Sequence, residues 1–297
     1  MTTKKVLIFL NPAAGKGNAN YLAKSLLRYA MAHDIHCVVV ESQDTTQISI
    51  GLAEAIAGSH YDALIAIGGD GLVHSAIQVI ADSQTPLYVV PAGTGNDFAR
   101  SNGLLETNPS VVFNIIYGRE PVSIDLGRIK TEDSLQYFGQ ILSTGFDAQV
   151  NACANEHFPF AGRMKYNFAT LVELPKFNSI MYALEIDGVK RDLRAMLVAI
   201  ANGPTYGGGM QLCPMADRSD GFLDILILHP VSKVELLKVF PKVYSGRHIA
   251  HPAVEFIKTR KITVSANTSA YADGERIGSL PIEVDVLSKS LRTWAKI

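Results

Sequence analysis

Cysteine, net charge and long apolar runs are all scarce in this chain of 297 residues. Its three cysteines, Cys37, Cys153 and Cys213, are widely spaced and odd in number, which excludes a zinc pattern and a disulfide framework. Such cysteine usage is typical of a reducing cytoplasm, so we expect a cytoplasmic protein. The formal net charge is −1. Because the chain lacks a global basic field, we expect no nucleic-acid partner, and any attraction to anionic lipid must be local.

No apolar run reaches the length of a membrane span. The N-terminal run VLIFL follows two lysines but is too short for the core of a signal peptide, and Asn11-Pro12 stops it. The run at 196–201 also falls far short of the roughly 20 residues that cross a bilayer. Hydrophobic residues make up 47% of the chain and charged residues 19%. We therefore expect a globular protein that is soluble, or peripheral at the inner membrane surface at most.

The first 120 residues alternate between strand and helix patterns. Continuous apolar runs predict strands at 5–10, 37–42, 62–67 and 86–91, and helical spacing predicts helices at 21–34, 48–58, 75–82 and 110–118. Asn108 and Pro109 provide a capping residue and a first-turn proline for the last of these helices. Continuous apolar strands separated by helices predict a parallel sheet that is covered on both faces.

The pattern changes near residue 122, after which strand signals dominate. We expect strands at 122–130, 135–146, 180–188, 190–203, 221–230, 255–267 and 280–289. Two helices interrupt them, one at 164–177 and one that opens with the capping box Ser232-x-x-Glu235. The fold class is thus α/β plus β. Residues 1–123, with 290–297 returning, would form an α/β domain, and 124–289 a mostly antiparallel β-sandwich domain, with a cleft between them.

Three glycine-rich bends, at 11–17, 68–71 and 91–97, each follow a predicted strand. In an open parallel sheet, ligands bind beyond the carboxyl ends of the strands, so we expect the bends to cluster there. Glycines let the backbone approach a ligand, and the amides of helix N-termini suit phosphate groups. Asp70 and Asp97 would repel phosphate but can hold Mg²⁺ that bridges phosphate oxygens. Each bend alone is equally explained as an ordinary turn or loop.

Two familiar nucleotide-binding motifs are missing. Lys16 is followed by Gly17 rather than by serine or threonine, and the leading glycine of a Walker loop is absent. The first bend also lacks the G-x-G-x-x-G pattern, which argues against a dinucleotide-dependent dehydrogenase.

A series of short motifs nevertheless carries a resemblance that covers nearly the whole chain. The motifs are N-P-A-A-G (11–15), G-G-D-G (68–71), P-A-G-T-G-N-D-F-A-R (91–100), D-L-G (125–127), G-F-D-A (145–148), G-G-G-M (207–210), D-G-F-L-D (220–224) and A-D-G-E (272–275). In this order and spacing they resemble the diacylglycerol-kinase-type lipid kinases, which include bacterial soluble lipid kinases and sphingosine kinases. The G-G-D-G element and the two-domain plan are also similar to NAD kinases and 6-phosphofructokinases.

The resemblance implies an ATP- and Mg²⁺-dependent kinase that transfers the γ-phosphoryl group to a lipid hydroxyl, such as that of diacylglycerol. ATP would lie between the domains, and its site would comprise Asn11, Pro12, Ala13, Ala14, Gly15, Gly68, Gly69, Asp70, Gly71, Thr94, Gly95, Asn96 and Asp97. Asp70 and Asp97 would organise the catalytic Mg²⁺. A second, structural Mg²⁺ or Ca²⁺ would bind Asp217, Asp220 and the Phe222 carbonyl, although this stretch can also be read as a simple turn.

The resemblance also places a catalytic carboxylate in the stretch A-D-G-E, where Asp273 and Glu275 are both candidates for the general base. With an ordinary pKa of about 4 the group is ionised at neutral pH, so it accepts the proton as the new P–O bond forms. Asp-Gly between strands is equally a strong hairpin signal, which leaves a purely structural reading open.

The residues that follow G-G-D-G depart from the family pattern. After G-G-D-G the family usually has Thr-x-Asn-Glu, whereas this chain has Leu72, Val73, His74 and Ser75. A lone histidine there is more often solvated or capping than functional. Two alternatives to a lipid kinase therefore remain: a kinase of a soluble, NAD-like acceptor, and a nucleotide- or lipid-binding regulator with weakened activity.

The tract 155–177 is either a lipid-access or membrane-docking surface or a core helix with extended lysines. A homodimer is compatible with the sequence.

Overall fold

The structure, a computed structural model, describes residues 4–42, 44–157 and 165–295. The chain divides into two compact units: unit 1 comprises Met1–Ile124 and Lys289–Ile297, and unit 2 comprises Asp125–Ser288. Strands β5 (Val122–Lys130) and β16 (Ile282–Thr293) each contribute residues to both units.

Unit 1 contains a parallel sheet with the strand order β2-β1-β3-β4. Its strands are β1 (Lys5–Leu10), β2 (His36–Glu41), β3 (Ala63–Gly68) and β4 (Leu87–Pro91). The central strand β3 is buried along its whole length, which is why its sequence is a continuous apolar run rather than an alternating one.

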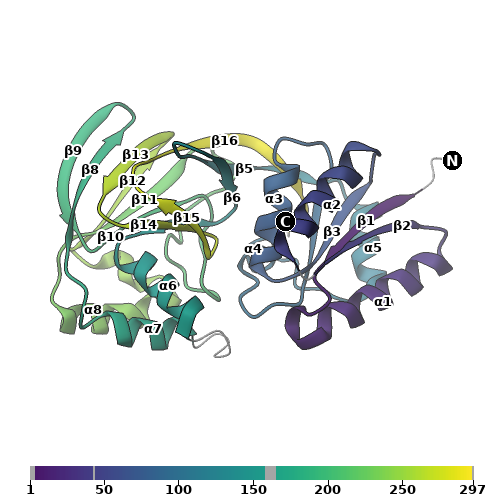
Figure 1. Cartoon of the computed structure of the whole chain (residues 1–297), viewed down its shortest axis with the longest axis horizontal. Coiled ribbons are helices and arrows are strands. Elements are labelled where there is room, and N and C mark those ends of the chain that lie inside the picture. The colour runs from purple at the N-terminus through teal and green to yellow at the C-terminus, as the bar shows by residue number, and fades with distance from the viewer. Residues whose placement is uncertain (1–3, 43, 158–164, 296–297) are drawn as a thin grey trace. The chain divides into compact units, whose positions relative to one another are not determined.

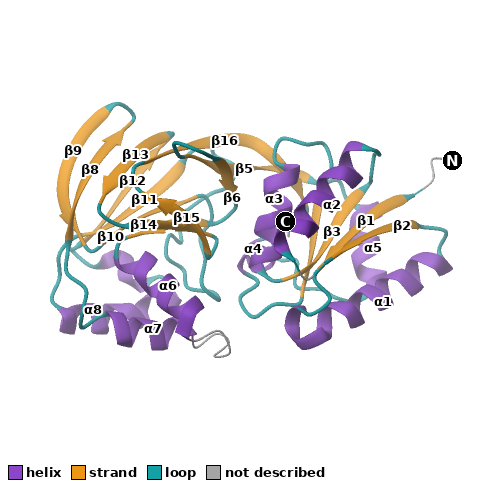
Figure 2. Ribbon diagram, in the orientation of Figure 1, coloured by secondary structure: helices purple, strands orange, loops and turns teal. Residues whose placement is uncertain are grey.

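Helices cover both faces of this sheet (Figures 1 and 2). They are α1 (Asn18–Ala32), α2 (Thr45–Ala57), α3 (Asp70–Ile80), the short α4 (Asp97–Ser101) and α5 (Pro109–Gly118), and the 3-10 turn η1 (Ala14–Gly17) precedes α1. Helix α1 contacts α5, and α2 contacts α3. The Asn108 side chain accepts a hydrogen bond from the Ser110 amide and Pro109 follows it, so the predicted N-terminus of α5 is confirmed.

The last residues of β16 pair with the parallel sheet of unit 1. Thr293 pairs with Leu87 in parallel, and its hydroxyl donates to the Leu87 carbonyl at 2.8 Å. The buried Trp294 ring donates from Nε1 to the Arg119 carbonyl at 2.9 Å. These bonds join the end of the chain to the sheet and to the residue that follows α5.

Unit 2 consists of antiparallel strands in two sheets. One sheet contains the order β16-β13-β8-β9, with β5 paired to β16 and β6 paired to β5, and the other has the order β12-β11-β10-β7-β14-β15. The bounds are β6 (Leu135–Phe138), β7 (Ile141–Thr144), β8 (Ile180–Ile186), β9 (Val189–Ala195), β10 (Leu197–Ala201), β11 (Leu223–Leu228), β12 (Val254–Thr259), β13 (Lys261–Ala266), β14 (Ser269–Ala272) and β15 (Glu275–Ser279). A fully buried core that includes Val198, Ile225 and Ile262 draws on both sheets.

Helices pack on one side of unit 2 and enclose a second apolar core (Figure 2). They are α6 (Phe146–His157), α7 (Lys165–Glu173), α8 (Lys233–Val239) and the 3-10 turns η3 (Phe240–Ser245) and η4 (Arg247–Ala250). The Ser232 hydroxyl caps α8 by accepting from the Glu235 amide. The Glu235 side chain binds His251 instead of closing the predicted capping box.

The predicted fold class is confirmed, because a parallel α/β sheet is followed by antiparallel β-sheet structure. Several predicted elements were wrong in detail. The predicted strands 135–146, 190–203 and 255–267 are each two strands, and the last two change sheet at single residues, Met196 and Arg260. Helix α6 was not predicted. Helix α3 begins at Asp70, five residues before the predicted start, so that Asp70 lies in its first turn.

Candidate functional site

The bends that follow β3 and β4 touch each other through bare backbone. A Cβ built on Gly93 would lie 2.4 Å from the Gly69 Cα, and one built on Gly69 would lie 3.2 Å from the Gly93 Cα. The Ala92 amide also donates to the Gly68 carbonyl at 2.9 Å. A side chain at Gly93 would therefore overlap the opposite bend, and one at Gly69 would be tightly packed against it.

The bend that follows β1 reaches the same place. A Cβ on Gly15 would lie 2.2 Å from the Ala92 carbonyl oxygen, and Gly15, Lys16 and Gly17 all have left-handed backbone (φ of 60°, 57° and 89°). The Asn11 side chain closes the start of this bend by accepting from the Ala13 amide at 3.0 Å. All three predicted bends thus meet at one edge of the sheet, as expected for the carboxyl ends of neighbouring parallel strands.

Asp70 links two of the bends. Its Oδ1 accepts hydrogen bonds from the amides of Asp97 at 2.7 Å and Phe98 at 3.4 Å, so it caps the start of α4. Its other oxygen, Oδ2, would lie 2.4 Å from a Cβ on Gly95, and the Asp97 Oδ2 would lie 3.4 Å from the same point. Two carboxylate oxygens therefore face one small space.

Asn96 shapes the bend that carries Thr94 and Gly95. Its side chain accepts from the Gly93 amide at 3.0 Å and donates to the Gly93 carbonyl at 2.8 Å, with Asn96 itself in left-handed conformation (φ 54°). The closed ring leaves Thr94 exposed at the tip of the bend. Arg100 adds a bond from its guanidinium to the Gly95 carbonyl at 3.3 Å.

This arrangement fits a phosphorylated ligand with a divalent cation. Close carboxylates repel each other, and a cation held between them and phosphate oxygens removes that repulsion. No side chain caps α3 at Gly69, which matches a helix start that faces an anion. Among the described residues, no three His, Cys, Asp or Glu side chains lie close enough to form a metal site by themselves. A cation here would therefore need oxygens from its ligand.

The residues that depart from the family pattern have structural roles. Leu72 packs against Gly68, where an added Cβ would lie 2.6 Å from its Cδ2, and the Ser75 hydroxyl donates to the Gly71 carbonyl at 3.1 Å. His74 is buried, and its Nε2 lies 3.3 Å from the Gln78 side-chain nitrogen. The expectation of a solvated or capping histidine was wrong. Helix α3 begins at Asp70, so His74 lies beyond its first turn and its side chain is buried.

In unit 2, the stretch A-D-G-E is a hairpin turn between β14 and β15. Asp273 has left-handed backbone (φ 51°), and its carboxylate accepts from the amides of Gly139 at 2.8 Å, Gln140 at 2.9 Å and Ile141 at 3.2 Å. Asp273 thus ties the turn to the segment between β6 and β7. Glu275 is exposed at the start of β15. The two predicted base candidates therefore differ sharply in their surroundings.

The loop at 217–222 is closed by hydrogen bonds from its own residues. The Asp217 carboxylate accepts from the Ser219 amide and hydroxyl at 3.0 and 2.6 Å, and the Ser219 bonds lower its pKa. Asp220 accepts from the Phe222 amide at 3.0 Å through one oxygen and binds the Lys258 ammonium through the other. The Lys258 ammonium therefore binds the same Asp220 carboxylate that a metal ion in this loop would need as a ligand.

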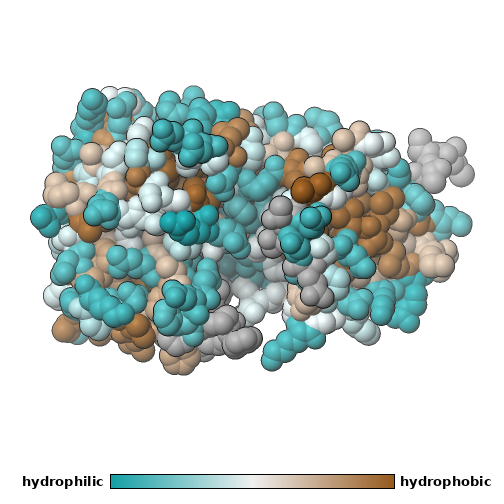
Figure 3. Space-filling view, in the orientation of Figure 1, coloured by the Kyte–Doolittle hydropathy of each residue, from teal (hydrophilic) through white to brown (hydrophobic). Residues whose placement is uncertain are grey.

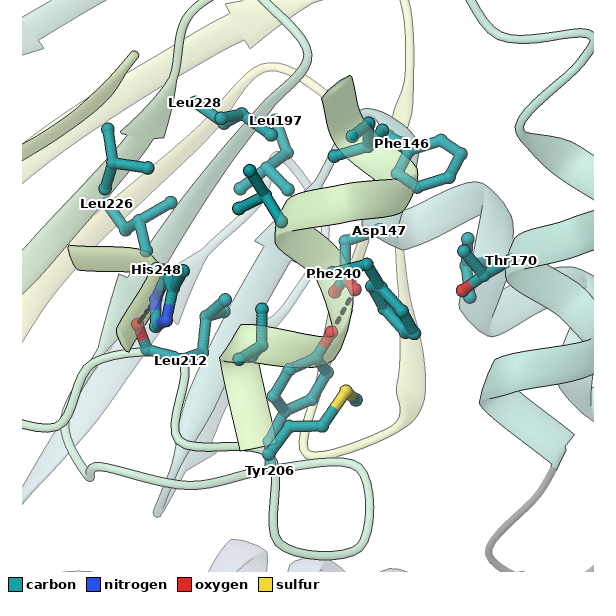
Figure 4. A pocket seen from close by; sticks show the side chains of 16 residues that line it. Phe146, Asp147, Thr170, Leu197, Tyr206, Leu212, Leu226, Leu228, Phe240 and His248 are labelled. Carbon is teal, nitrogen blue, oxygen red and sulfur yellow. Dashed lines mark hydrogen bonds between the residues drawn. The ribbon is translucent and has the colours of Figure 1, made fainter. Parts of the chain in front are cut away.

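An apolar pocket of about 570 Å³, including the part that is open to solvent, lies in unit 2 between the sheet and the helices (Figure 4). Leucine, valine and phenylalanine side chains dominate its walls, which come from α6, α7, α8, β10, β11, β12, η3, η4 and the segment 206–212. Asp147 is buried in it, accepts a hydrogen bond from the Tyr206 hydroxyl, and has its pKa raised by burial. Asp147 lies in the quoted motif G-F-D-A, but sequence reasoning gave neither it nor His248 a role.

Two further observations bear on the predicted surroundings of the protein. None of the helices in the described ranges is long and apolar enough to cross a membrane. The tract 155–177, for which the sequence leaves a lipid-access surface and a core helix open, is only partly described, because residues 158–164 lie outside the described residues.

Comparison with known proteins gives a consistent result. Residues 5–129 match the model of the diacylglycerol kinase catalytic domain, and residues 140–295 match that of the YegS C-terminal NAD kinase beta sandwich-like domain. A diacylglycerol kinase of Mycobacterium tuberculosis is 35% identical over 97% of this chain and 94% of its own length. A diacylglycerol kinase of Bacillus subtilis is 26% identical over 94% of this chain and 92% of its own length.

Solved structures share the fold. A crystal structure from Bacillus anthracis aligns with a TM-score of 0.79 at 20% identity, covering 99% of this chain and 95% of that chain. A second, of a diacylglycerol kinase from the same organism, aligns with a TM-score of 0.72 at 18% identity over 99% of this chain and 97% of that chain. Together the fold and the matches define a kinase. The chain belongs to the diacylglycerol kinase family, with both family models and a whole-length relative in agreement.

Proposed function

We propose that this protein transfers the γ-phosphoryl group of ATP to the hydroxyl of a lipid acceptor such as diacylglycerol, in a Mg²⁺-dependent reaction. The observation that carries the proposal is the meeting of three bare-backbone bends beside the paired carboxylates of Asp70 and Asp97 in unit 1. The Mycobacterium tuberculosis relative, named a diacylglycerol kinase, supports the choice of acceptor.

In this proposal, the three bends of unit 1 hold the nucleotide. The backbone of Asn11–Gly15, Gly68–Gly71 and Thr94–Asp97 would line the phosphate chain, with bound Mg²⁺ supplying charge neutralisation at the phosphate oxygens. Asp70 has a double role, since one oxygen caps α4 while the other faces the same space as Asp97. This coupling would fix the carboxylates in place before the nucleotide arrives.

We propose Glu275 as the general base. The acceptor hydroxyl oxygen attacks the γ-phosphorus in line, the bond to the β-phosphate oxygen breaks, ADP leaves, and the hydroxyl proton passes to the Glu275 carboxylate. Asp273 is less suited to this role, because three backbone amides already bind its carboxylate. Asp273 instead holds the turn in the shape that presents Glu275.

The pocket of unit 2 supports a lipid acceptor over a soluble, NAD-like one. A charged nucleotide acceptor would need many polar partners, whereas the pocket walls are almost all aliphatic or aromatic. Helix α6 connects the pocket with the catalytic turn, because Phe146, Asp147 and Val150 line the pocket and the Asn155 side chain donates to the Gly274 carbonyl at 3.1 Å. An acyl chain in the pocket would therefore belong to the same acceptor that Glu275 deprotonates.

We further propose that unit 2 contacts an anionic bilayer through α7 and α8, where it would collect its acceptor. Exposed apolar side chains on these helices are Phe168, Leu171, Val172, Val234 and Leu237. Figure 3 shows apolar residues along the lower edge of unit 2, where Figure 1 places these helices. The exposed Lys233 and Lys238, which flank the apolar residues of α8, suit anionic headgroups. Such contact would make a cytoplasmic protein peripheral at the inner membrane surface.

We also propose that the loop at 217–222 exchanges its Lys258 contact for a structural divalent cation, bound by Asp217, Asp220 and the Phe222 carbonyl. In the structure the Asp220 carboxylate is engaged by Lys258, so lysine and metal would compete for the same oxygen. No catalytic step depends on this cation.

The experiment that tests the function is an acceptor panel with Mg²⁺ and labelled ATP. We expect label transfer to diacylglycerol in mixed micelles and none to NAD. Transfer to NAD alone would replace the lipid-kinase proposal with a soluble-acceptor kinase. Nucleotide binding without transfer to any acceptor would identify a regulator.

A further inference from the structure

His248 is a buried polar side chain in the wall of the apolar pocket of unit 2. It comes from η4, is only 3% exposed, and lines the pocket with leucine and valine neighbours. Its Nε2 lies 2.9 Å from the Leu212 carbonyl oxygen, while its Nδ1 has no hydrogen-bond partner among the described residues. Figure 4 shows this ring with its bond to Leu212 on the opposite side of the Asp147–Tyr206 pair from Thr170.

The hydrogen bond to Leu212 fixes the chemistry of the free nitrogen. A carbonyl oxygen can only accept, so Nε2 must carry the proton, and Nδ1 of the neutral ring is then an acceptor. Burial lowers the pKa of His248, which keeps the ring neutral at physiological pH. Nδ1 of His248 is therefore a buried acceptor in the pocket wall that has no donor among the described residues.

The remaining polar groups of the pocket do not meet this need. The Tyr206 hydroxyl donates to Asp147. The Thr170 hydroxyl, itself without a partner among the described residues, lies on the far side of that pair, and the labelled lining groups near His248 are the aliphatic Leu212 and Leu226. Burying a polar atom without a partner is costly, so native proteins rarely leave one unless a ligand or water completes it.

We propose that the pocket takes an acyl chain bearing a hydroxyl group, which donates a hydrogen bond to Nδ1 of His248. This inference rests on the proposed lipid-kinase function and adds a preference among acceptors. The hydroxyl belongs to the chain rather than to the glycerol, because the catalytic turn meets α6 at Asn155. That residue lies about 12 Å along the helix from the pocket residue Asp147.

Binding without ATP tests the proposal independently of turnover. The probes are monoacylglycerols of one chain length, either unsubstituted or with a hydroxyl at successive positions, which compete with a fluorescent fatty acid for the full-length protein. We expect one narrow range of hydroxyl positions to bind about tenfold more tightly than the unsubstituted chain, the size of a single net hydrogen bond. A series in which every hydroxylated chain binds more weakly, as expected if ordered water already satisfies Nδ1, would overturn the proposal.

Variants identify the group responsible. His248→Phe keeps a planar ring but removes the acceptor, so the ratio between its affinities for the hydroxylated and the unsubstituted chain should fall to about one. His60→Phe, an exposed histidine of unit 1, is the matched control and should keep the preference. If His248→Phe does not fold, the wild-type series remains decisive, and ¹⁵N shifts of His248 on adding the preferred chain should show Nδ1 gaining a donor. Failure of phosphoryl transfer would leave these binding results unchanged.

Discussion

Gly69 and Gly93, the bend residues after β3 and β4, are so close that a Cβ on Gly93 would lie 2.4 Å from the Gly69 Cα. Two segments separated in the sequence therefore form one backbone surface, which the bend after β1 joins through Gly15 and Ala92. The proposed nucleotide site depends on this contact, which a side chain at Gly93 would disrupt.

Gly93→Ala should separate the bends and raise the KM for ATP. The added methyl group overlaps the Gly69 backbone, so we expect a loss of about 1–3 kcal/mol in the free energy of unfolding together with the weaker binding. Gly118→Ala is the control, because nothing lies within 4 Å of a Cβ there. Urea unfolding and initial rates at several ATP concentrations check both variants. An unchanged KM for Gly93→Ala would separate the bends from nucleotide binding.

Asp70→Asn should lower kcat by about a hundredfold or more while the fold persists. In the proposed mechanism Asp70 organises the phosphate-bound cation, so removing its charge should cost transition-state stabilisation, but the asparagine Oδ1 can still accept from the Asp97 amide. The control is Asp34→Asn, at an exposed left-handed position that asparagine tolerates. Steady-state kinetics and thermal unfolding give the two readouts. Wild-type turnover in Asp70→Asn would remove this carboxylate from the mechanism.

The two carboxylates of the hairpin turn should behave oppositely. Glu275→Gln should reduce kcat by about 10²–10⁴ and leave the melting temperature unchanged, as expected for an exposed general base. Asp273→Ala should lower the free energy of unfolding by about 2 kcal/mol or more, because it leaves buried amides without an acceptor. Full activity in Glu275→Gln, with Asp273→Asn inactive but stable, would reverse the two roles.

The arrangement of the candidate site in unit 1 could be predicted from the sequence almost completely. Each bend follows a strand whose apolar run is unmistakable, and parallel strands bring their carboxyl ends together, so the meeting of Gly69 with Gly93 follows from pattern and topology. His74 was misread because no helix-start signal precedes α3, whose N-cap is Gly69 with no side-chain cap. The N-terminus of that helix is set by the sheet and the neighbouring bend rather than by local residues.

The sequence predicted that unit 2 is mostly antiparallel β-structure, but it did not predict where several strands end or that an apolar pocket is present. Met196 and Arg260 are each the single residue between two strands that belong to different sheets, and one residue within a continuous strand pattern carries no signal for such a change. The pocket brings Asp147, Tyr206 and His248 together from α6, the segment after β10, and η4. Only tertiary packing makes these distant residues neighbours.

Lys258→Met should make the stability of unit 2 respond to Mg²⁺. The variant removes the ammonium that neutralises Asp220, so a divalent cation becomes the best remaining counter-charge. Thermal unfolding in Mg²⁺ and in chelator should differ more for Lys258→Met than for wild type, and Asp220→Ala should abolish the difference. Equal melting temperatures in both buffers for all three proteins would contradict competition between lysine and metal.

Acid should destabilise unit 2 partly through Glu255. Hydrogen bonds from Arg191 and then His229 lower the pKa of Glu255 from 4.5 to about 2. Because the folded-state value is the lower one, the contribution is fully present above pH 4.5 and is lost as the pH falls towards about 2. Glu255→Gln should therefore flatten the pH dependence of the unfolding free energy across that window, measured by urea titration. A wild-type slope in the variant would assign the acid sensitivity to other groups.

Isothermal titration of Mg²⁺-ATP into the wild-type protein tests the central claim most directly. The touching bends of unit 1 predict saturable heat with one nucleotide per chain, and Mg²⁺ should tighten the binding because it relieves the repulsion between Asp70 and Asp97. The absence of heat across the titration, or binding that Mg²⁺ weakens, would contradict the account.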